Sequence, residues 1–213
     1  IGFINEVADL CEAVGANVQD VSKAMGIDHR IGSKFLNPGP GYGGSCFPKD
    51  VKAFYSTAKK FNVNLSIINA VHESNQSRIE KVAKKIINHV ASGSILSFLG
   101  LSFKPNTDDI RESSSIKIAS YLLKKGYKIN CFDPKAMHNA KIKFDKFNYF
   151  DSAYQACNNV DAIIIGTEWN EFRALNFLEI SKIVKEKKIF DLRNIYRRSE
   201  LEKLNFEYYG TGK

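Results

Sequence analysis

The stretch ILSFLGLSFKPNTDDIRESSSIKIASYLLKKGYKINCF, residues 95–132, decides the fold of this chain. Its two apolar runs, at 95–100 and 127–132, predict buried strands. Between them, apolar residues recur at helical spacing over 113–125, which predicts a helix that ends at Gly126. Strand, helix and strand in this order predict a βαβ unit, with parallel strands and a right-handed crossover.

The rest of the second half continues this alternation. Apolar runs at 160–165 and 188–192 predict two further buried parallel strands, and helical segments are expected at about 152–157 and 178–185. We therefore expect an α/β fold class, in which residues 93–213 form a small doubly wound, Rossmann-like parallel sheet.

The first half shows no strand pattern and is expected to be all-helical. Helical spacing appears in four segments, at 7–14, 18–25, 48–58 and 66–90. The third of these helices opens at Pro48 and carries Val51, Phe54, Tyr55 and Ala58 on one face. A boundary near residue 92 would divide the chain into a central helical domain at 1–92 and an α/β domain at 93–213.

Composition excludes several classes of protein. The chain has 213 residues, of which 44% are hydrophobic and 25% charged, as in ordinary globular proteins and unlike collagen or disordered tails. Lys and Arg outnumber Asp and Glu by 31 to 23, a net charge of +8, but the bases are dispersed along helices. No apolar run is long enough to span a membrane, and the N-terminus has no signal-peptide pattern.

Four cysteines are too widely spaced to predict a disulfide framework or a metal site. Cys11, Cys131 and Cys157 lie in apolar helical or strand patterns and are expected to be small buried hydrophobes. Cys46 differs, because it ends the glycine-rich loop NPGPGYGGSC at 37–46, whose backbone can approach a ligand closely. Unpaired thiols indicate a reducing compartment, and a cytoplasmic protein without a metal is expected.

Cys46 is a candidate nucleophile. It precedes a predicted helix start at Pro48, where backbone N–H groups and the helix dipole favour a thiolate. Lys49 and Asp50 follow within one turn. A thiol, a lysine and a carboxylate can together form a covalent acyl intermediate, stabilise an oxyanion and activate water. An incidental loop cysteine remains the alternative interpretation.

The loop after the first strand of the α/β half is a candidate phosphate site. It lacks the G-x-G-x-x-G pattern of dinucleotide-binding folds. It does lead from a strand end to a helix N-terminus, with Lys104 and Arg111 nearby, where open α/β sheets bind phosphorylated ligands. A surface loop with two solvated bases is the alternative. Asp133 and Arg193 follow two other predicted strands, and Asp133 could accept a ligand hydroxyl or only cap a turn.

Several strings of residues resemble the UDP-glucose/GDP-mannose dehydrogenase family over nearly the whole chain. They are HRIG at 29–32, GYGGSCFPKD at 41–50, FK at 103–104, RESS at 111–114, FDP at 132–134 and DLRN at 191–194. The first two strings most resemble the branch of the family that acts on UDP-glucose.

This resemblance implies an NAD-dependent oxidation of a nucleotide sugar through a cysteine thioester. It implies that Cys46 is the nucleophile and that Asp50 helps to activate the hydrolytic water. It implies that the substrate-binding residues are Arg30, Phe35, Tyr42, Gly43, Phe103, Lys104 and Arg193, with Arg30 lent to the neighbouring subunit of a homodimer. Arg111 would lie near the NAD pyrophosphate.

The resemblance also implies what the chain lacks. The family begins with an NAD-binding domain, and its central helix carries a lysine and an asparagine that would precede Ile1. We therefore expect a C-terminal piece of a longer protein that is inactive alone. A dehydrogenase for another nucleotide sugar, such as GDP-mannose, is the nearest alternative. A basic nucleic-acid-binding module is a more distant one, since neither half shows clustered bases with interleaved aromatic residues.

Overall fold

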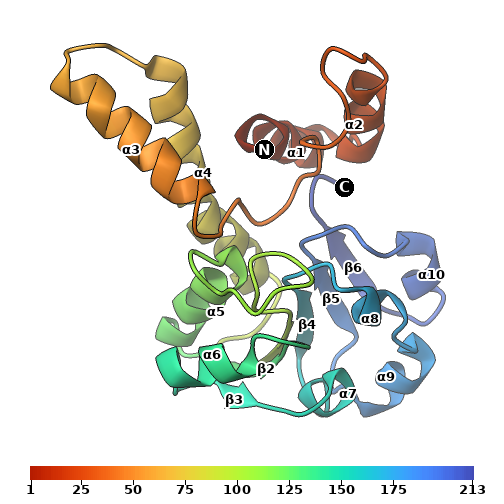
Figure 1. The fold of residues 1–213 in the computed structure, drawn as a ribbon. Coiled ribbons are helices and arrows are strands. Elements are labelled where there is room, and N and C mark those ends of the chain that lie inside the picture. The colour runs from red at the N-terminus through yellow and green to blue at the C-terminus, as the bar shows by residue number, and fades with distance from the viewer.

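A computed structural model describes residues 1–213, the whole chain. The first half is helical, as predicted, with four helices; in Figure 1 the first three lie above the α/β half and the fourth runs down into it. Their bounds are α1 Gly2–Val14, α2 Val18–Gly26, α3 Phe47–Lys60 and α4 Ser66–Ile87. Helices α3 and α4 form a projecting antiparallel arm, and α1 and α2 form a separate pair beside it (Figure 1). None of the helices is long and apolar enough to cross a membrane.

The second half is a six-stranded, all-parallel sheet in the order β3-β2-β1-β4-β5-β6. Its strands are β1 Ile95–Leu99, β2 Lys128–Phe132, β3 Asn148–Tyr149, β4 Ala162–Ile165, β5 Lys188–Asp191 and β6 Glu207–Gly210. Its helices are α5 Ser114–Lys124, α6 Met137–Lys143, α7 Ala153–Ala156, α8 Asn170–Arg173, α9 Phe177–Ile183 and α10 Arg198–Glu202. The four predicted strands are confirmed, and the edge strands β3 and β6 are additional.

Apolar side chains cover both faces of the sheet, which confirms the doubly wound arrangement. One core joins α4 and α5 to one face through residues such as Ile86, Leu122 and Ile164. The other core joins α7, α8 and α9 to the opposite face, where Ile163 and Phe172 are fully buried. Because successive side chains of a strand alternate between faces, neighbouring residues 163 and 164 enter different cores.

Helix α4 belongs to both halves of the molecule. Its first turns pair with α3 in the arm, whereas Val82, Ala83 and Ile86 near its end are buried in the core of the sheet domain. Figure 1 shows α4 running without a break from the arm into the sheet domain, so it joins the two parts rigidly.

Local sequence rules account for the helix ends of the first half. Gly15 ends α1 in the left-handed conformation, with φ 74°, and Oδ1 of Asn17 accepts the N–H of Gln19 to cap α2. On the predicted apolar face of α3, Ala58 is buried, whereas Phe54 is 57% exposed. The arm projects from the rest of the chain, and only α4 packs against α3 there, so Phe54 stays exposed beside a groove that the two helices share.

Candidate functional site

Cys46 is the N-cap residue of α3, and its side chain is exposed. The other three cysteines are buried, as predicted. Pro48 lies in the first turn of α3, where its missing N–H costs no helical hydrogen bond. Oγ of Ser45 lies 3.6 Å from the sulfur of Cys46. The thiol therefore stands at the positive end of a fourteen-residue helix dipole.

The glycine-rich loop packs against the loop that precedes α5. The N–H of Gly44 donates to the carbonyl of Arg111 at 2.9 Å. A Cβ on Gly43 would lie 3.1 Å from the carbonyl carbon of Glu112, and one on Gly44 would lie 2.7 Å from the Phe103 ring. Glycine is thus required here by close approach, and this contact brings Cys46 towards Arg111.

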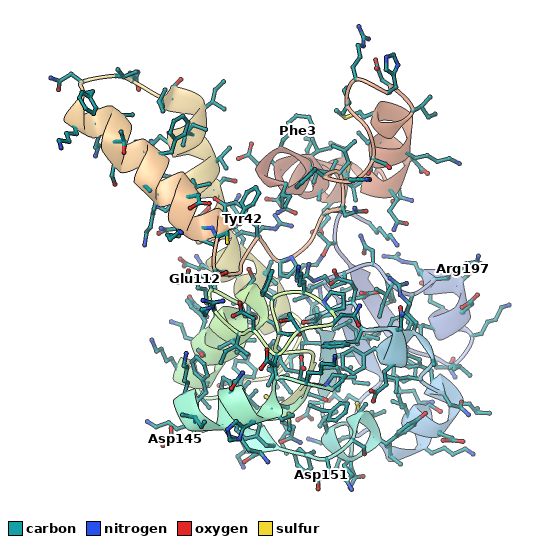
Figure 2. The ribbon with its side chains drawn as sticks, viewed as in Figure 1. Phe3, Tyr42, Glu112, Asp145, Asp151 and Arg197 are labelled. Atoms are coloured by element: carbon teal, nitrogen blue, oxygen red, sulfur yellow. The ribbon has the colours of Figure 1, made fainter.

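A cationic cleft of about 810 Å³ opens beside this contact, between α3, α4 and the start of α5. Four basic residues line it, Lys49, Lys52, Arg111 and Lys117, against one acidic residue, Glu112. Tyr42 and Glu112 lie at the junction of arm and sheet domain in Figure 2. Ser114, the first residue of α5, adds a helix N-terminus to the lining. Positive side chains and a helix N-terminus together favour a phosphorylated ligand.

Arg111 is held at the rim of this cleft by Asp109. Nη2 of Arg111 lies 2.7 Å from Oδ2 of Asp109, and Nε donates to Oδ1 at 3.0 Å. The hydrogen bonds from the guanidinium hold the pKa of Asp109 below its usual value. The ion pair fixes the exposed arginine in one orientation while leaving a cation at the cleft.

Cys46 itself borders a second hollow, an apolar groove of about 610 Å³ along the arm. Its lining comes from α3 and α4 and consists of Cys46, Phe47, Asp50, Val51, Ala53, Phe54, Thr57 and Ile68. The exposed carboxylate of Asp50 lies 3.4 Å from the ammonium of Lys49. The thiol therefore lies between a cationic cleft and an apolar groove, with a carboxylate one turn away.

Four of the predicted substrate-binding residues gather near the two loops. Tyr42 lines the cleft and is only 7% exposed, and its ring packs edge-on against Phe47 at 5.0 Å. The Phe103 ring contacts the glycine loop, and the exposed Lys104 ammonium lies 5.4 Å from the centre of that ring. Gly43 contacts Glu112, as described above.

Arg193 is near these residues, but its guanidinium is largely occupied by hydrogen bonds and an ion pair within the protein. Its Nε donates to the carbonyl of Gly166 at 2.9 Å and lies 3.2 Å from Glu168. A second nitrogen approaches the carbonyl of Phe103 at 3.4 Å. Burial lowers the pKa of the guanidinium, although Glu168 opposes this. Arg193 thus ties the ends of β4 and β5 to the Phe103 loop.

Arg30 and Phe35 lie apart from the cleft. Both are exposed and neither lines it, and Nη2 of Arg30 lies 2.5 Å from Oδ2 of Asp28. The structure of one chain therefore does not bring these two residues to Cys46.

The two central strands approach each other closely where a doubly wound sheet usually has its ligand crevice. Strand order reverses between β1 and β4, and there a Cβ on Gly100 would lie 2.6 Å from the backbone nitrogen of Thr167. Asp133 is 1% exposed and accepts hydrogen bonds from the N–H groups of Leu101 and Ser102. Its other carboxylate oxygen accepts the N–H groups of Lys135 and Ala136, so Asp133 caps the turn that follows β2, as in the turn-capping alternative. The cationic cleft lies instead between α3, α4 and the start of α5.

Several residues that line the cleft could not be identified as site residues from the sequence. Asn75, His72 and Gln76 project from α4, and Lys117 from α5. Polar residues on a helix ordinarily face solvent, so their pattern carries no sign of a site. Only the fold shows that this face of α4 meets the glycine loop.

These features define a class, an α/β protein with an exposed cysteine beside a cationic cleft suited to a phosphorylated ligand. Two family models match the chain: the UDP-glucose/GDP-mannose dehydrogenase family, central domain, over residues 1–77, and the UDP binding domain of the same family over residues 97–198. The chain belongs to the UDP-glucose/GDP-mannose dehydrogenase family.

Similar proteins agree with this assignment. The chain is 44% identical to the UDP-glucose 6-dehydrogenases of Rickettsia typhi and Rhizobium meliloti, over all of this chain and 50% and 49% of those proteins. A solved UDP-glucose dehydrogenase from Pyrobaculum islandicum matches with a TM-score of 0.87 and 31% identity, over all of this chain and 47% of that one. The chain spans about half the length of the curated relatives that it matches.

Proposed function

We propose that this chain is the substrate-binding part of a UDP-glucose 6-dehydrogenase, which oxidises UDP-glucose to UDP-glucuronate with two NAD. The observation that carries the proposal is the exposed Cys46 at a helix N-terminus, on the edge of a cationic cleft, in a chain with a UDP-binding domain. A thiol in this position can hold a sugar carbon covalently, while the cleft binds phosphates.

The positive lining of the cleft is suited to a diphosphate group, such as those of UDP-glucose and NAD. Arg111, Lys49 and Lys52 line it, and a pyrophosphate would meet positive charge from two different elements. Bound NAD would supply the hydride acceptor in both oxidation steps. Tyr42, Gly43, Phe103 and the other proposed substrate residues, Lys104, Arg193, Phe35 and Arg30, would hold the UDP-sugar.

Cys46 would divide the four-electron oxidation into two steps. Loss of a hydride and a proton from the C6 alcohol gives an aldehyde, and the thiolate adds to its carbonyl to form a thiohemiacetal. Loss of a second hydride and a proton gives a thioester. Water, assisted by Asp50, then adds to the thioester carbonyl, and the C–S bond breaks to release the carboxylate and the thiol.

We also propose the two domains 1–92 and 93–213, joined through α4, and a homodimer formed by the helical domain. Phe3, Leu10 and Val14 are each more than half exposed and lie on one stripe of α1, where Figure 2 labels Phe3. A second copy would cover this stripe, and Arg30 could then reach the neighbouring site. Free cysteines and a nucleotide-sugar substrate support a cytoplasmic location.

Protection of Cys46 from alkylation tests the proposal. UDP-glucose is expected to slow the reaction of Cys46 with iodoacetamide about tenfold at ten times its Kd, and UDP, which lacks the sugar, is expected to slow it less. The buried cysteines do not compete for the reagent. Binding of UDP-glucose without protection would contradict the role of Cys46, and protection by GDP-mannose alone would favour the alternative substrate.

Turnover by the chain alone is a separate test. No reduction of NAD with UDP-glucose is expected, because the chain spans only about half of its relatives' length. Measurable reduction by the purified chain would contradict this expectation.

A further inference from the structure

Helix α4 holds the glycine-rich loop through the side chain of Asn75. Oδ1 of Asn75 accepts the N–H of Tyr42 at 2.9 Å, and Nδ2 donates to the carbonyl of Tyr42 at 3.1 Å. Two opposite hydrogen bonds to the backbone of one residue fix its orientation, as pairing with a neighbouring strand would. The Asn75 amide therefore fixes both the orientation of the loop backbone at Tyr42 and its distance from α4.

Close packing at Gly41 makes this contact specific. Gly41 has φ +119°, and a Cβ there would lie 2.9 Å from Oδ1 of Asn75 and 3.1 Å from Oγ of Ser114. The loop is thus enclosed between α4 and the start of α5 at a position that only glycine fits.

Arg78, one turn later on α4, holds the loop at a second point. Its Nε donates to the carbonyl of Gly39 at 2.6 Å, and its Nη1 lies 2.8 Å from Oδ1 of Asp9. The side chain is only 6% exposed, and Asn5 accepts the N–H of Gly39 at 2.8 Å. Residues 39 and 42 are therefore both fixed to the same helix.

Tyr42 is linked to Cys46 by two routes. Along the chain, only three residues separate them, and Gly44 among these is bonded to Arg111. Through space, the Tyr42 ring packs against Phe47, the first residue of α3, and Cys46 caps that helix. A displacement of Tyr42 therefore moves both ends of the segment that carries the thiol.

We propose that Asn75 is a positioning residue for Cys46, which acts by holding the backbone of Tyr42. This inference rests on the proposed function, since a positioned thiol matters to the reaction only if it is the nucleophile. Asn75 does not touch the sulfur, and its role is to keep the sulfur at the α3 N-terminus beside the cationic cleft.

The test places a trifluoroacetonyl label on Cys46, the exposed thiol, and records its ¹⁹F resonance in the 213-residue chain. Asn75→Ala removes both hydrogen bonds to Tyr42, and we expect the resonance to shift or split by more than its linewidth. Asn75→Asp keeps the acceptor for the Tyr42 N–H but puts a carboxylate oxygen in place of the donor, against the Tyr42 carbonyl, so a displacement is again expected. Asn69→Ala is the matched control, because Asn69 also lies on α4 but its amide bonds only Glu73 on the same helix.

Thermal unfolding of each variant separates positioning from stability. Suppose that a folded Asn75→Ala chain unfolds at a lower temperature and yet gives the same ¹⁹F resonance as the labelled chain without the substitution. That result would show that Asn75 has only a structural role, and it would overturn the proposal. An Asn75→Ala chain that does not fold leaves Asn75→Asp to decide, and an unchanged resonance in that isosteric variant would also overturn it. The label reports position without turnover, so failure of the proposed oxidation would leave the expected shift intact.

Discussion

Gly43 is the position where the two loops of the site are closest, and its substitution gives a quantitative test of their contact. A Cβ there would lie closer than 3.0 Å to the carbonyl oxygen of Glu112 and 3.1 Å from its carbonyl carbon. Both are backbone atoms that cannot rotate away, so the loops must separate by several tenths of an ångström. The adjacent hydrogen bond from Gly44 to Arg111 would lengthen with them.

The expected cost follows from these two effects. Overpacking of this kind costs about 1–3 kcal/mol, and a weakened hydrogen bond adds about 1 kcal/mol. Gly43→Ala should therefore lower the free energy of unfolding by about 2–4 kcal/mol, which corresponds to a fall in Tm of roughly 4–16 °C for a chain of this size. Scanning calorimetry measures this shift directly.

Gly2→Ala is the control for the same chemical change. Gly2 lies in α1, and an added Cβ would lie 3.6 Å from its nearest neighbour, at ordinary contact distance. Alanine also favours a helix over glycine, so an unchanged or slightly raised Tm is expected. An unchanged Tm in Gly43→Ala, or equal losses in both variants, would refute the close approach of the loops.

Three further predictions concern the thiols, the sheet and the cleft. Under native conditions one thiol of four should react promptly with a maleimide, by mass spectrometry, and two or more would contradict the burial of the others. Burial raises the pKa of Asp161, but hydrogen bonds from Lys185 and the Ile95 N–H outweigh burial and bring this pKa below its usual value. The ionised Asp161 therefore stabilises the fold above the pKa of the unfolded state, about 3.9, and this stabilisation is lost as the pH falls through the pKa of the folded state. Lys185→Ala should raise the pH of half-unfolding in acid, whereas exposed Lys146→Ala should not. Lys52→Glu should weaken the binding of UDP-glucose and reduce its salt dependence, by calorimetry at two ionic strengths, and unchanged binding would exclude Lys52 from the phosphate site.

The sheet was predictable where strands are buried on both faces. The runs that became β1, β2, β4 and β5 are continuous and apolar because helices cover both sides of them. Strand β3 has two residues, and β6 reads EYYG at the edge, so neither has enough apolar sequence to be recognised. Phe54 lies on the predicted apolar face of α3 and is exposed, since helical periodicity identifies an apolar face but not whether anything covers it.

The site was predictable only where backbone chemistry determines it. Cys46 stood out because glycines and a helix start surround it, and that environment is local in sequence. Asn75 and Arg78 lie more than thirty residues from the loop that they hold, as the separations of 33 and 39 residues in their hydrogen bonds show. Such contacts depend on how α4 crosses the loop, which no local pattern specifies.

Binding of nucleotides to the chain tests the central claim most directly. The Tm of the purified chain should be measured with UDP, UDP-glucose, GDP-mannose and a DNA oligomer at matched ionic strength, because a ligand that binds the native state raises it. The account predicts stabilisation by UDP and UDP-glucose alone, by about 2.7 kcal/mol at one hundred times Kd. Stabilisation by the DNA oligomer, or by GDP-mannose in place of the uridine nucleotides, would contradict it.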